Sequence, residues 1–431
     1  MWSNVSILTS APVLLADATW CGTLAAARDL GARGVKVTLA SESWIAPARW
    51  SRYVSQTVKC PSTKDAARFL AWLVRFGAER PGYVLYPTSD EVAWLIAAHS
   101  KVLARCYRLY TPPIDSLIGL LDKARLAELA REAGLDGPAS FVPQNESCVE
   151  RSGEKLSFPV YVKPRAQVFG REVGKGRRVD KPADLLPCWK AQRRQATYDA
   201  EILNQVRDID LPMLQTYACG TGNIYTVDGF VNETGELYAS LACVKLLQRP
   251  RGSGPGLIFE HAEIDEAIDR RLRSLFQSAG YYGIFDAEFL QCGDQRLLID
   301  VNPRFYNHMA FEIDRGLPLP WLAYLAATGH RNELEQELSR AREARVRKDA
   351  YLHRLPTVLL LAAQRLTRSM SAEDQLRWRR WISDRGGSAT DPMRTLNDPN
   401  PAVAEFALEA FRFVRHPRSQ LGGLLHSPES V

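Results

Sequence analysis

Residues 288–304 read EFLQCGDQRLLIDVNPR, and this stretch decides the fold of the chain. Two strand-like runs, Ile284–Gln291 and Arg296–Asn302, flank the short Gly-Asp-Gln connection at 293–295, so the sequence predicts a β-hairpin. With the turn centred on Asp294, each residue of one run acquires a defined partner on the other. The hairpin therefore fixes which side chains face each other.

Acidic and amide side chains share one face of this hairpin. The register places Glu288 across from Asp300 and Asp286 across from Asn302, because side chains alternate along a strand. Facing carboxylates repel each other, and a cation between them removes the repulsion. Mg²⁺ takes oxygen ligands, usually carboxylates together with nucleotide phosphates. The hairpin thus predicts a magnesium site, and an acidic, solvent-facing strand pair is the alternative interpretation.

The same register assigns the apolar residues of the hairpin. It puts Leu298 on the acidic face together with Leu290, and it puts Leu297 and Ile299 on the buried face. Arg304 follows a proline just beyond the second strand. We expect its guanidinium to provide positive charge for a phosphoryl or acyl-phosphate oxygen.

Glu288, eleven intervening residues and then DVNPR at 300–304 resemble the metal-binding signature of the ATP-grasp superfamily. The resemblance implies that Glu288, Asp300 and Asn302 hold two magnesium ions, which Mn²⁺ could replace, bridging the phosphates of ATP. Asp300 stands where the family prefers Glu, and it is shorter by one methylene. The Asn-Pro-Arg ending is more similar to the biotin-carboxylase and carbamoyl-phosphate branch than to the D-alanine ligase branch.

Composition bounds the class of protein. The 431 residues are 46% hydrophobic and 24% charged, which predicts a soluble chain of two or three domains. A net charge of +6 is mild for this length and argues against a nucleic-acid partner. The eight cysteines are scattered without a Cys-x-x-Cys pair, so we expect reduced thiols in a cytoplasmic protein. No signal peptide and no apolar run long enough for a transmembrane helix is expected.

The N-terminal region has the pattern of alternating strands and helices. Ala11–Ala16 and Gly34–Leu39 flank the helical run Thr23–Leu30, which predicts a βαβ unit of the doubly wound type. The intervening loop is not G-x-G-x-x-G, so a nicotinamide cofactor is not expected.

Another strand of this region, Tyr83–Tyr86, leads into a helix predicted over Val92–His99. Asp90 and Glu91 lie between them, at the carboxyl end of the strand, where open α/β sheets bind ligands. The Pro-Thr-Ser-Asp-Glu turn at 87–91 resembles the one in ATP-grasp enzymes, and this resemblance implies that it borders the pocket of the acceptor substrate. The alternative is that the polar residues before the helix serve only as N-caps.

The resemblance also implies nucleotide contacts upstream of the hairpin. Lys123 matches a family lysine at the start of a helix, and Lys163 matches the strand lysine that meets the α and β phosphates. Gln215 and the backbone up to Tyr217 match the hinge that binds adenine, with Gln in place of the commoner Glu. Asn223 is assigned to the ribose hydroxyls. Taken alone, Lys123 would be an ordinary surface charge.

Two basic, glycine-containing stretches are also similar to parts of the family's ATP site. Glycines and basic residues at 170–178 resemble the family's mobile flap over ATP, and a flexible basic loop is the alternative. Lys245 is placed like the family lysine that meets the γ-phosphate. Arg249 and Arg251 are expected to grip a substrate carboxylate, with solvated loop charges as the alternative.

The predicted fold class is α/β and α+β. We expect an N-terminal doubly wound pre-ATP-grasp domain at 1–115, a two-lobed ATP-grasp domain at 116–335 and a helical C-terminal extension at 336–431. The extension carries basic residues with Trp378 and Trp381, and packing on the chain itself or on a partner subunit is favoured over membrane binding. A homodimer through these helices is one such arrangement.

The resemblance implies an ADP-forming carboxylate–amine ligase. A carboxylate would attack the γ-phosphorus of ATP, and an amine would then attack the resulting acyl phosphate. Catalytic roles fall to Arg304, Lys245 and Arg249, and the partners are small carboxylate and amine substrates. A kinase of the same fold, a carboxylase of the carbamoyl-phosphate type and a non-catalytic nucleotide-binding module remain as alternatives.

Overall fold

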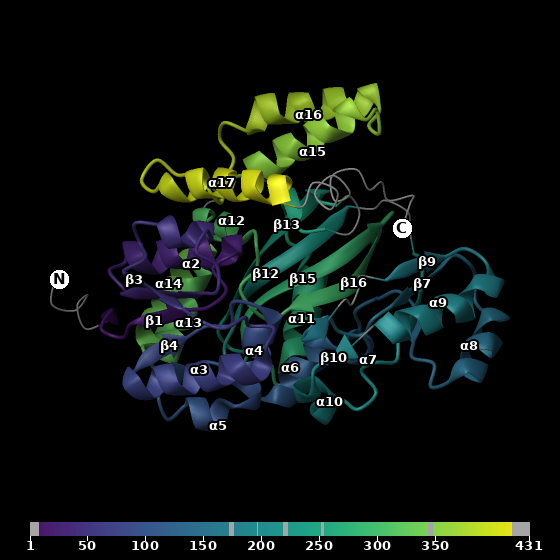
Figure 1. Cartoon of the computed structure of the whole chain (residues 1–431), viewed down its shortest axis with the longest axis horizontal. Coiled ribbons are helices and arrows are strands. Elements are labelled where there is room, and N and C mark those ends of the chain that lie inside the picture. The colour runs from purple at the N-terminus through teal and green to yellow at the C-terminus, as the bar shows by residue number, and fades with distance from the viewer. Residues whose placement is uncertain are drawn as a thin grey trace.

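A computed structural model describes the chain over residues 8–171, 176–195, 197–218, 223–250, 254–343 and 348–415. Four parts are visible in Figure 1. An N-terminal α/β unit lies at the left, a six-stranded sheet fills the centre, a small lobe lies at the right, and three C-terminal helices cross the top. The expected class, α/β together with α+β, is confirmed.

The N-terminal unit is built on a parallel sheet in the order β3-β2-β1-β4-β5. Buried apolar strands with helices between them produce this arrangement, because parallel strands need crossover connections. The strand order reverses between β1 and β4, which makes their carboxyl ends the place for a ligand. Its strands are β1 Val13–Leu15, β2 Val37–Ser41, β3 Gln56–Lys59, β4 Tyr83–Leu85 and β5 Tyr107–Leu109. Its helices are α2 Cys21–Ala32, α3 Ala66–Glu79, α4 Asp90–Ala98 and α5 Ser100–Leu103, with the 3₁₀ turn η1 Pro47–Trp50.

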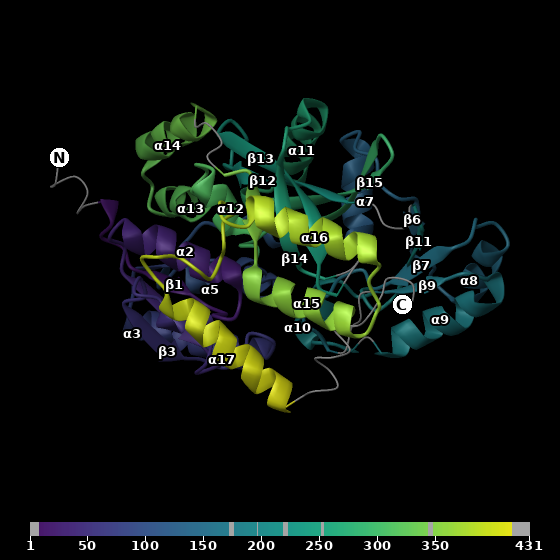
Figure 2. The ribbon, with the colours of Figure 1, turned by 90° about the horizontal axis from the view of Figure 1, so that it is seen from above.

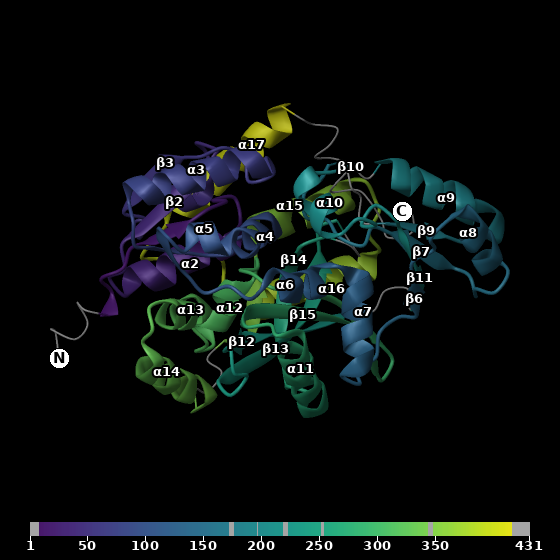
Figure 3. The ribbon, with the colours of Figure 1, turned by 90° about the horizontal axis from the view of Figure 1, so that it is seen from below.

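The small lobe contains an antiparallel sheet in the order β6-β11-β7-β9. One face of this sheet packs on α8 and α9 through an apolar cluster that includes Val160, Val162 and Trp189. The opposite face points toward the central sheet (Figure 3). The strands of the lobe are β6 Ser140–Phe141, β7 Val160–Lys163, β8 Gly170–Arg171, β9 Arg177–Val179, β10 Thr197–Tyr198 and β11 Met213–Thr216. The helices before and within it are α6 Ile114–Leu121, α7 Lys123–Glu132, α8 Glu146–Gly153, α9 Pro182–Gln195 and α10 Ala200–Gln205.

The central sheet is antiparallel, with the order β16-β15-β12-β13-β14-β17. Its last strand comes from the region expected to be purely helical, and it pairs with β14. The boundary after residue 335 stays a prediction, although this strand joins the sheet across it. The strands are β12 Ile224–Val231, β13 Tyr238–Gln248, β14 Gly256–Ala262, β15 Gly283–Cys292, β16 Gln295–Asn302 and β17 Ala350–Leu352. The accompanying helices are α11 Glu266–Ala279, α12 Met309–Asp314, α13 Leu319–Ala327 and α14 Arg331–Glu343.

The hairpin β15–β16 has the predicted register over its acidic part, since Asp286 pairs with Asn302 and Glu288 with Asp300. A bulge follows, and Phe289 pairs with Leu298. One extra residue reverses the facing of the strand beyond it. The expectation for the leucines is therefore wrong: Leu298 is buried in the core, whereas Leu297 is only partly buried.

The C-terminal helices α15 Arg354–Leu366, α16 Ala372–Arg385 and α17 Asn400–Arg415 cover the central sheet and the N-terminal unit (Figures 1 and 2). Trp378 is buried in an apolar cluster over the end of the sheet, and the Trp381 indole donates to Glu260 Oε1 at 2.5 Å. Asp398, just before α17, accepts hydrogen bonds from Arg28 Nε at 2.8 Å and from Ser51 Oγ at 2.7 Å. Packing on the chain itself thus explains the tryptophans. Within the described ranges, none of the helices has the length and apolarity that crossing a bilayer requires.

The state of the cysteines departs from expectation at one position. Six described cysteines carry free thiols, and three of them, Cys21, Cys60 and Cys243, are buried. Cys292, at the end of β15, is disulfide-bonded. The expectation of uniformly reduced thiols is therefore wrong for Cys292.

Candidate functional site

Each of the two facing carboxylates of the hairpin forms an ion pair with a lysine. Lys245 Nζ, from β13, lies 2.6 Å from Glu288 Oε1, and Lys123 Nζ, at the first residue of α7, lies 2.5 Å from Asp300 Oδ1. Burial alone would raise the pKa of Asp300, but the ammonium groups of Lys123 and Lys163 outweigh it and hold this pKa below its usual value. Three distant segments thus meet at the predicted metal ligands.

The amide of Asn302 connects the hairpin to the N-terminal unit. Its Nδ2 donates to Asp286 Oδ2 at 3.0 Å, and its Oδ1 accepts from Arg304 Nη2 at 2.9 Å. Arg304 Nε in turn donates to Asp90 Oδ1 at 2.7 Å, at the start of α4. The carboxyl edge of the parallel sheet therefore meets the hairpin through Asp90 and Arg304. Burial raises the pKa of neighbouring Glu91, and the charge of Asp90 raises it further.

Lys163 ends β7 and is held beside Lys123 by a buried ion pair. Arg165 contacts both carboxylate oxygens of Asp122, which is also the N-cap of α7. The backbone N–H of Lys123 donates to Arg165 O at 2.9 Å. Arg165 and Asp122 are thus positioning residues that the sequence reading did not single out.

The charge of Lys163 depends on pH in the unliganded protein. Burial lowers its pKa to about 7, and the neighbouring Lys123 contributes in the same direction. The protonated form, which attracts phosphate, therefore prevails below pH 7 and is lost above it. We expect ATP affinity to fall as pH rises from 6 to 9, by up to about tenfold per unit above 7. Calorimetric titration across this range tests it, with Lys163→Ala as the control that lacks this titration. An equally steep fall in Lys163→Ala would contradict the assignment.

The base of the predicted flap packs on Lys163. Gly176 has φ +114°, and a Cβ there would lie 2.6 Å from Lys163 Cβ. The remaining flap residues 172–175 lie outside the described residues. Gly176→Ala should displace Lys163 and raise the KM for ATP by about 10- to 150-fold, since loss of one charged hydrogen bond costs about 1.5–3 kcal/mol. Gly82→Ala is a matched control, because Gly82 also has positive φ, +95°, but open space around its Cβ position. Equal KM values for the two variants would remove Gly176 from the site.

Gln215 and its neighbours line the open face of the small lobe. Gln215 pairs in register with Tyr161, and the Tyr161 ring stacks on Tyr217 with centroids 5.7 Å apart and an interplanar angle of 8°. The Arg178 guanidinium lies 4.7 Å from the centroid of Tyr217. An aromatic and amide-bearing surface of this kind suits a purine base.

The other predicted residues are placed as follows. Asn223 is exposed just before β12, and its backbone O accepts from Gln291 N at 3.0 Å. Arg249 pairs with Glu409 of α17, with Nη1 3.5 Å from Oε2. Arg251 lies outside the described residues. Arg249 is therefore directed toward the C-terminal region in this structure.

A fully buried polar cluster lies on the same face of the central sheet, beside Glu288 and Lys245, and sequence reading missed most of it. His308 Nε2 lies 3.2 Å from Asp228 Oδ2, and the His308 ring stacks on Phe259. Burial raises the pKa of Asp228 to about 6, raises that of Glu312 to about 7, and lowers that of His308. One signal was available: Asp228 interrupts the otherwise apolar strand run IYTVDGFV at 224–231.

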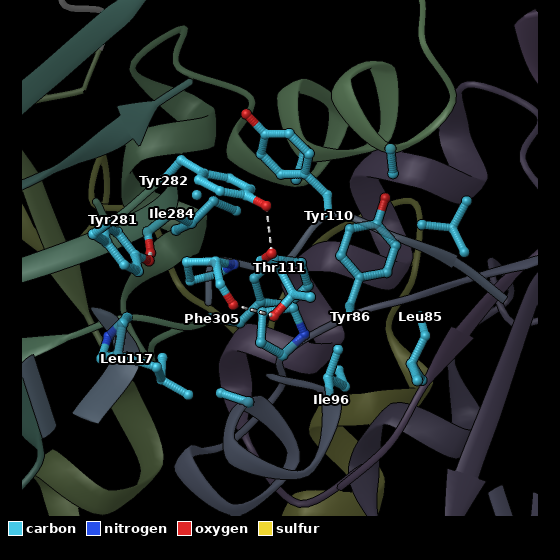
Figure 4. A pocket seen from close by; sticks show the side chains of 18 residues that line it. Leu85, Tyr86, Ile96, Tyr110, Thr111, Leu117, Tyr281, Tyr282, Ile284 and Phe305 are labelled. Atoms are coloured by element: carbon cyan, nitrogen blue, oxygen red, sulfur yellow. Dashed lines mark hydrogen bonds between the residues drawn. The ribbon is translucent and has the colours of Figure 1, made fainter. Parts of the chain in front are cut away.

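A separate apolar cavity of about 30 Å³ lies between β4 and the start of β15. Figure 4 shows the rings of Tyr86, Tyr110 and Tyr282 around it, with Tyr282 hydrogen-bonded to Thr111. Its volume suits about one water-sized molecule. We interpret it as a packing gap next to the site.

No protein-family model matches this sequence, and neither does any curated protein. Solved structures do match. Biotin carboxylase from Campylobacter jejuni, in a complex with β,γ-ATP, has a TM-score of 0.58 at 15% identity, over 74% of this chain and 71% of that one. L-amino acid ligase from Bacillus licheniformis has 0.52 at 16% identity, over 74% of each chain.

N5-carboxyaminoimidazole synthetase from Staphylococcus aureus, complexed with ADP, has a TM-score of 0.55 at 16% identity, over 74% of this chain and 77% of that one. The chain has the ATP-grasp fold. At these identities the likeness is one of architecture, and it supports the ATP-grasp interpretation of the hairpin and the two lobes.

Proposed function

We propose that this ATP-grasp protein is an ADP-forming ligase that activates a carboxylate as an acyl phosphate for attack by an amine. The observation that carries the proposal is the pair of facing carboxylates, Glu288 and Asp300, each neutralised by a lysine from a different element. Such a convergence of fixed charges around oxygen ligands suits a polyphosphate with divalent cations. The named ligases among the structural neighbours point to the same class of reaction.

The donor set fits magnesium. Glu288, Asp300 and Asn302 offer oxygens alone, which a hard divalent cation prefers. Asp286 Oδ1 is buried next to Asn302 and receives no hydrogen bond from the described residues. When bound, one or two Mg²⁺ ions would add positive charge to the phosphate oxygens. In this scheme Lys123 and Lys245 would release their carboxylates and turn to the nucleotide.

The remaining side chains have assigned roles. We place adenine against Gln215 and Tyr217, the ribose near Asn223, the α and β phosphates at Lys163, and the γ-phosphate at Lys245. The substrate carboxylate oxygen attacks the γ-phosphorus, and the bond to the β,γ-bridging oxygen breaks to give ADP. The amine then attacks the acyl carbon, the carbon–oxygen bond to phosphate breaks, and phosphate leaves with the amine proton passing to solvent. Arg304 would stabilise the oxyanion of this second step.

The acceptor side of the site is assigned to the N-terminal unit. Asp90 and Glu91 border it at the carboxyl edge of the parallel sheet, and their negative charge suits an amine substrate. Arg249 and Arg251 are assigned to the substrate carboxylate. In that role Arg249 would exchange its contact with Glu409 for the substrate.

Dimerisation through the C-terminal helices is part of the proposal. The exposed side of α17 carries Val403, Phe406 and Val414, spaced as one apolar stripe. We place the protein in the cytoplasm, since six of the seven described cysteines carry free thiols and only Cys292 among them is disulfide-bonded. Sedimentation velocity should give a dimer for the wild type and a monomer for Phe406→Asp; a wild-type monomer at high micromolar concentration would exclude the dimer.

The test of the activity is ADP release against panels of carboxylates and amines. A ligase requires both substrates for turnover, and hydroxylamine in place of the amine should trap the acyl phosphate as a hydroxamate. Release of ADP without an amine, with a stable phosphorylated product, would indicate a kinase instead. ATP binding without turnover on any pair would support a nucleotide-binding module.

A further inference from the structure

The buried cluster beside the hairpin brings four metal-ligating side chains together. Asp228 of β12, Cys243 of β13, His308 before α12 and Glu312 of α12 each offer a ligand atom, and these atoms lie within 4.8 Å of one another. All four side chains are buried, at 0–4% exposure. Two neighbouring strands and the segment that follows the hairpin therefore converge on one point.

The spacing of the ligand atoms suits a tetrahedral ion. Asp228 Oδ2 lies 3.2 Å from His308 Nε2 and 3.6 Å from Cys243 Sγ. A tetrahedral Zn²⁺ with bonds of about 2.0 Å to N or O and 2.3 Å to S separates its ligands by about 3.3 and 3.5 Å. These two separations are close to those values, and all separations among the four ligand atoms are within 4.8 Å.

Two buried carboxylate oxygens in the cluster lack a donor. Neither Asp228 Oδ1 nor Glu312 Oε2 receives a hydrogen bond from any described residue. Asp228 also lies opposite Asp286 in the strand register, so two buried carboxyl groups face each other. Buried oxygens of this kind need a proton or a cation, and either one would relieve the repulsion.

The charges balance around a divalent ion. Asp228, Glu312 and the Cys243 thiolate would contribute three negative charges, and Arg315, whose Nη2 lies 3.1 Å from Glu312 Oε1, contributes one positive charge. A divalent cation makes the sum over these four side chains and the ion zero. Neutral His308 supplies a nitrogen lone pair, and its ring is fixed by stacking on Phe259 with centroids 4.2 Å apart.

We propose that Asp228, Cys243, His308 and Glu312 form a second metal site, closed and structural, for a borderline-soft divalent ion of the Zn²⁺ class. Mixed sulfur, nitrogen and oxygen ligands favour such an ion over Mg²⁺, whereas the hairpin presents only oxygens. The inference does not rest on the ligase activity. Because His308 lies four residues after Arg304, the ion would anchor the segment that carries Arg304 to the central sheet.

Metal content of the tag-free, full-length protein tests the proposal. After dialysis against EDTA, reloading with Zn²⁺ and gel filtration, elemental analysis should give about one Zn²⁺ per chain. Cys243→Ser and His308→Gln should each weaken Zn²⁺ binding by at least about 10–100-fold. Cys60→Ser is the matched control, because Cys60 is also a buried free thiol but lies outside the cluster. Wild type without Zn²⁺, or variants that bind it as well as the control does, would overturn the site.

A spectroscopic measurement on the wild type keeps the test independent of variant folding. Co²⁺ in place of Zn²⁺ should give a thiolate-to-metal charge-transfer band in the near ultraviolet and the visible bands of tetrahedral coordination. Saturation at about one Co²⁺ per chain, unaffected by excess Mg²⁺, is expected. Co²⁺ spectra typical of six oxygen ligands, or loss of the bands on adding Mg²⁺, would contradict the assignment.

Discussion

Glu288→Gln should lower ADP formation by about 10²–10³-fold, because removal of one group that stabilises transition-state charge costs that much. The substitution keeps the shape of the side chain and removes its charge, which leaves Lys245 without its partner at 2.6 Å. Initial rates of ADP release at saturating ATP and MgCl₂ measure the effect. Circular dichroism should match that of the wild type, since Glu288 is only partly buried and glutamine keeps the shape of its side chain.

A matched control lies six residues away in the same hairpin. Asp294 is exposed at the turn, so Asp294→Asn removes the same charge without touching the predicted ligands and should keep wild-type rates. Asn302→Ala should behave like Glu288→Gln. Wild-type turnover in Glu288→Gln or Asn302→Ala would refute the metal assignment.

Arg304→Lys should lower amine transfer by about 10²-fold while ATP affinity changes little. Lysine keeps the positive charge but loses the planar fork that contacts Asp90 and Asn302 at once. The readout is the rate of product formation from a carboxylate and an amine, compared with hydroxamate formation from the same carboxylate. If Arg304 acts on the second step, product formation falls more than carboxylate activation does.

Asp90→Asn separates this role from a structural one. It removes the ionic partner of Arg304 but keeps the guanidinium in place. A purely structural Arg304 would give the same loss in Asp90→Asn and Arg304→Lys. At saturating amine, which offsets weaker amine binding in Asp90→Asn, equal losses in both variants would exclude Arg304 from the reaction, whereas a much smaller loss in Asp90→Asn supports it.

The hairpin was predictable because its turn and its strand pairing depend on residues that are close together in the sequence. A turn at 293–295 and alternating side chains give the register directly, and the structure has Glu288 opposite Asp300 as expected. The doubly wound N-terminal unit followed from its apolar strands in the same way. The carboxyl edge of that unit meets the hairpin through Asp90 and Arg304, a contact that the sequence did not predict.

Other features depend on tertiary packing, which local patterns do not contain. A bulge after Glu288 turns Leu298 to the opposite face of the sheet. No residue type in these two strands indicates the position of the bulge. The Asp122–Arg165 pair joins two elements that are separated by 43 residues. The cluster of Asp228, Cys243 and Glu312 assembles from residues that look unrelated along the chain. β17 joins the central sheet although it belongs to a region that the sequence predicts to be helical.

The central claim is that Glu288, Asp300 and Asn302 hold Mg²⁺ together with the nucleotide. Calorimetric titration of a non-hydrolysable ATP analogue, with and without MgCl₂, tests it most directly on wild type, Asp294→Asn and the double variant Glu288→Gln/Asn302→Ala. Mg²⁺ should strengthen binding to the wild type and to Asp294→Asn by at least about tenfold and leave the double variant unaffected, since a bound ligand shifts an equilibrium only by its differential affinity. An equal Mg²⁺ effect in all three proteins would contradict the account.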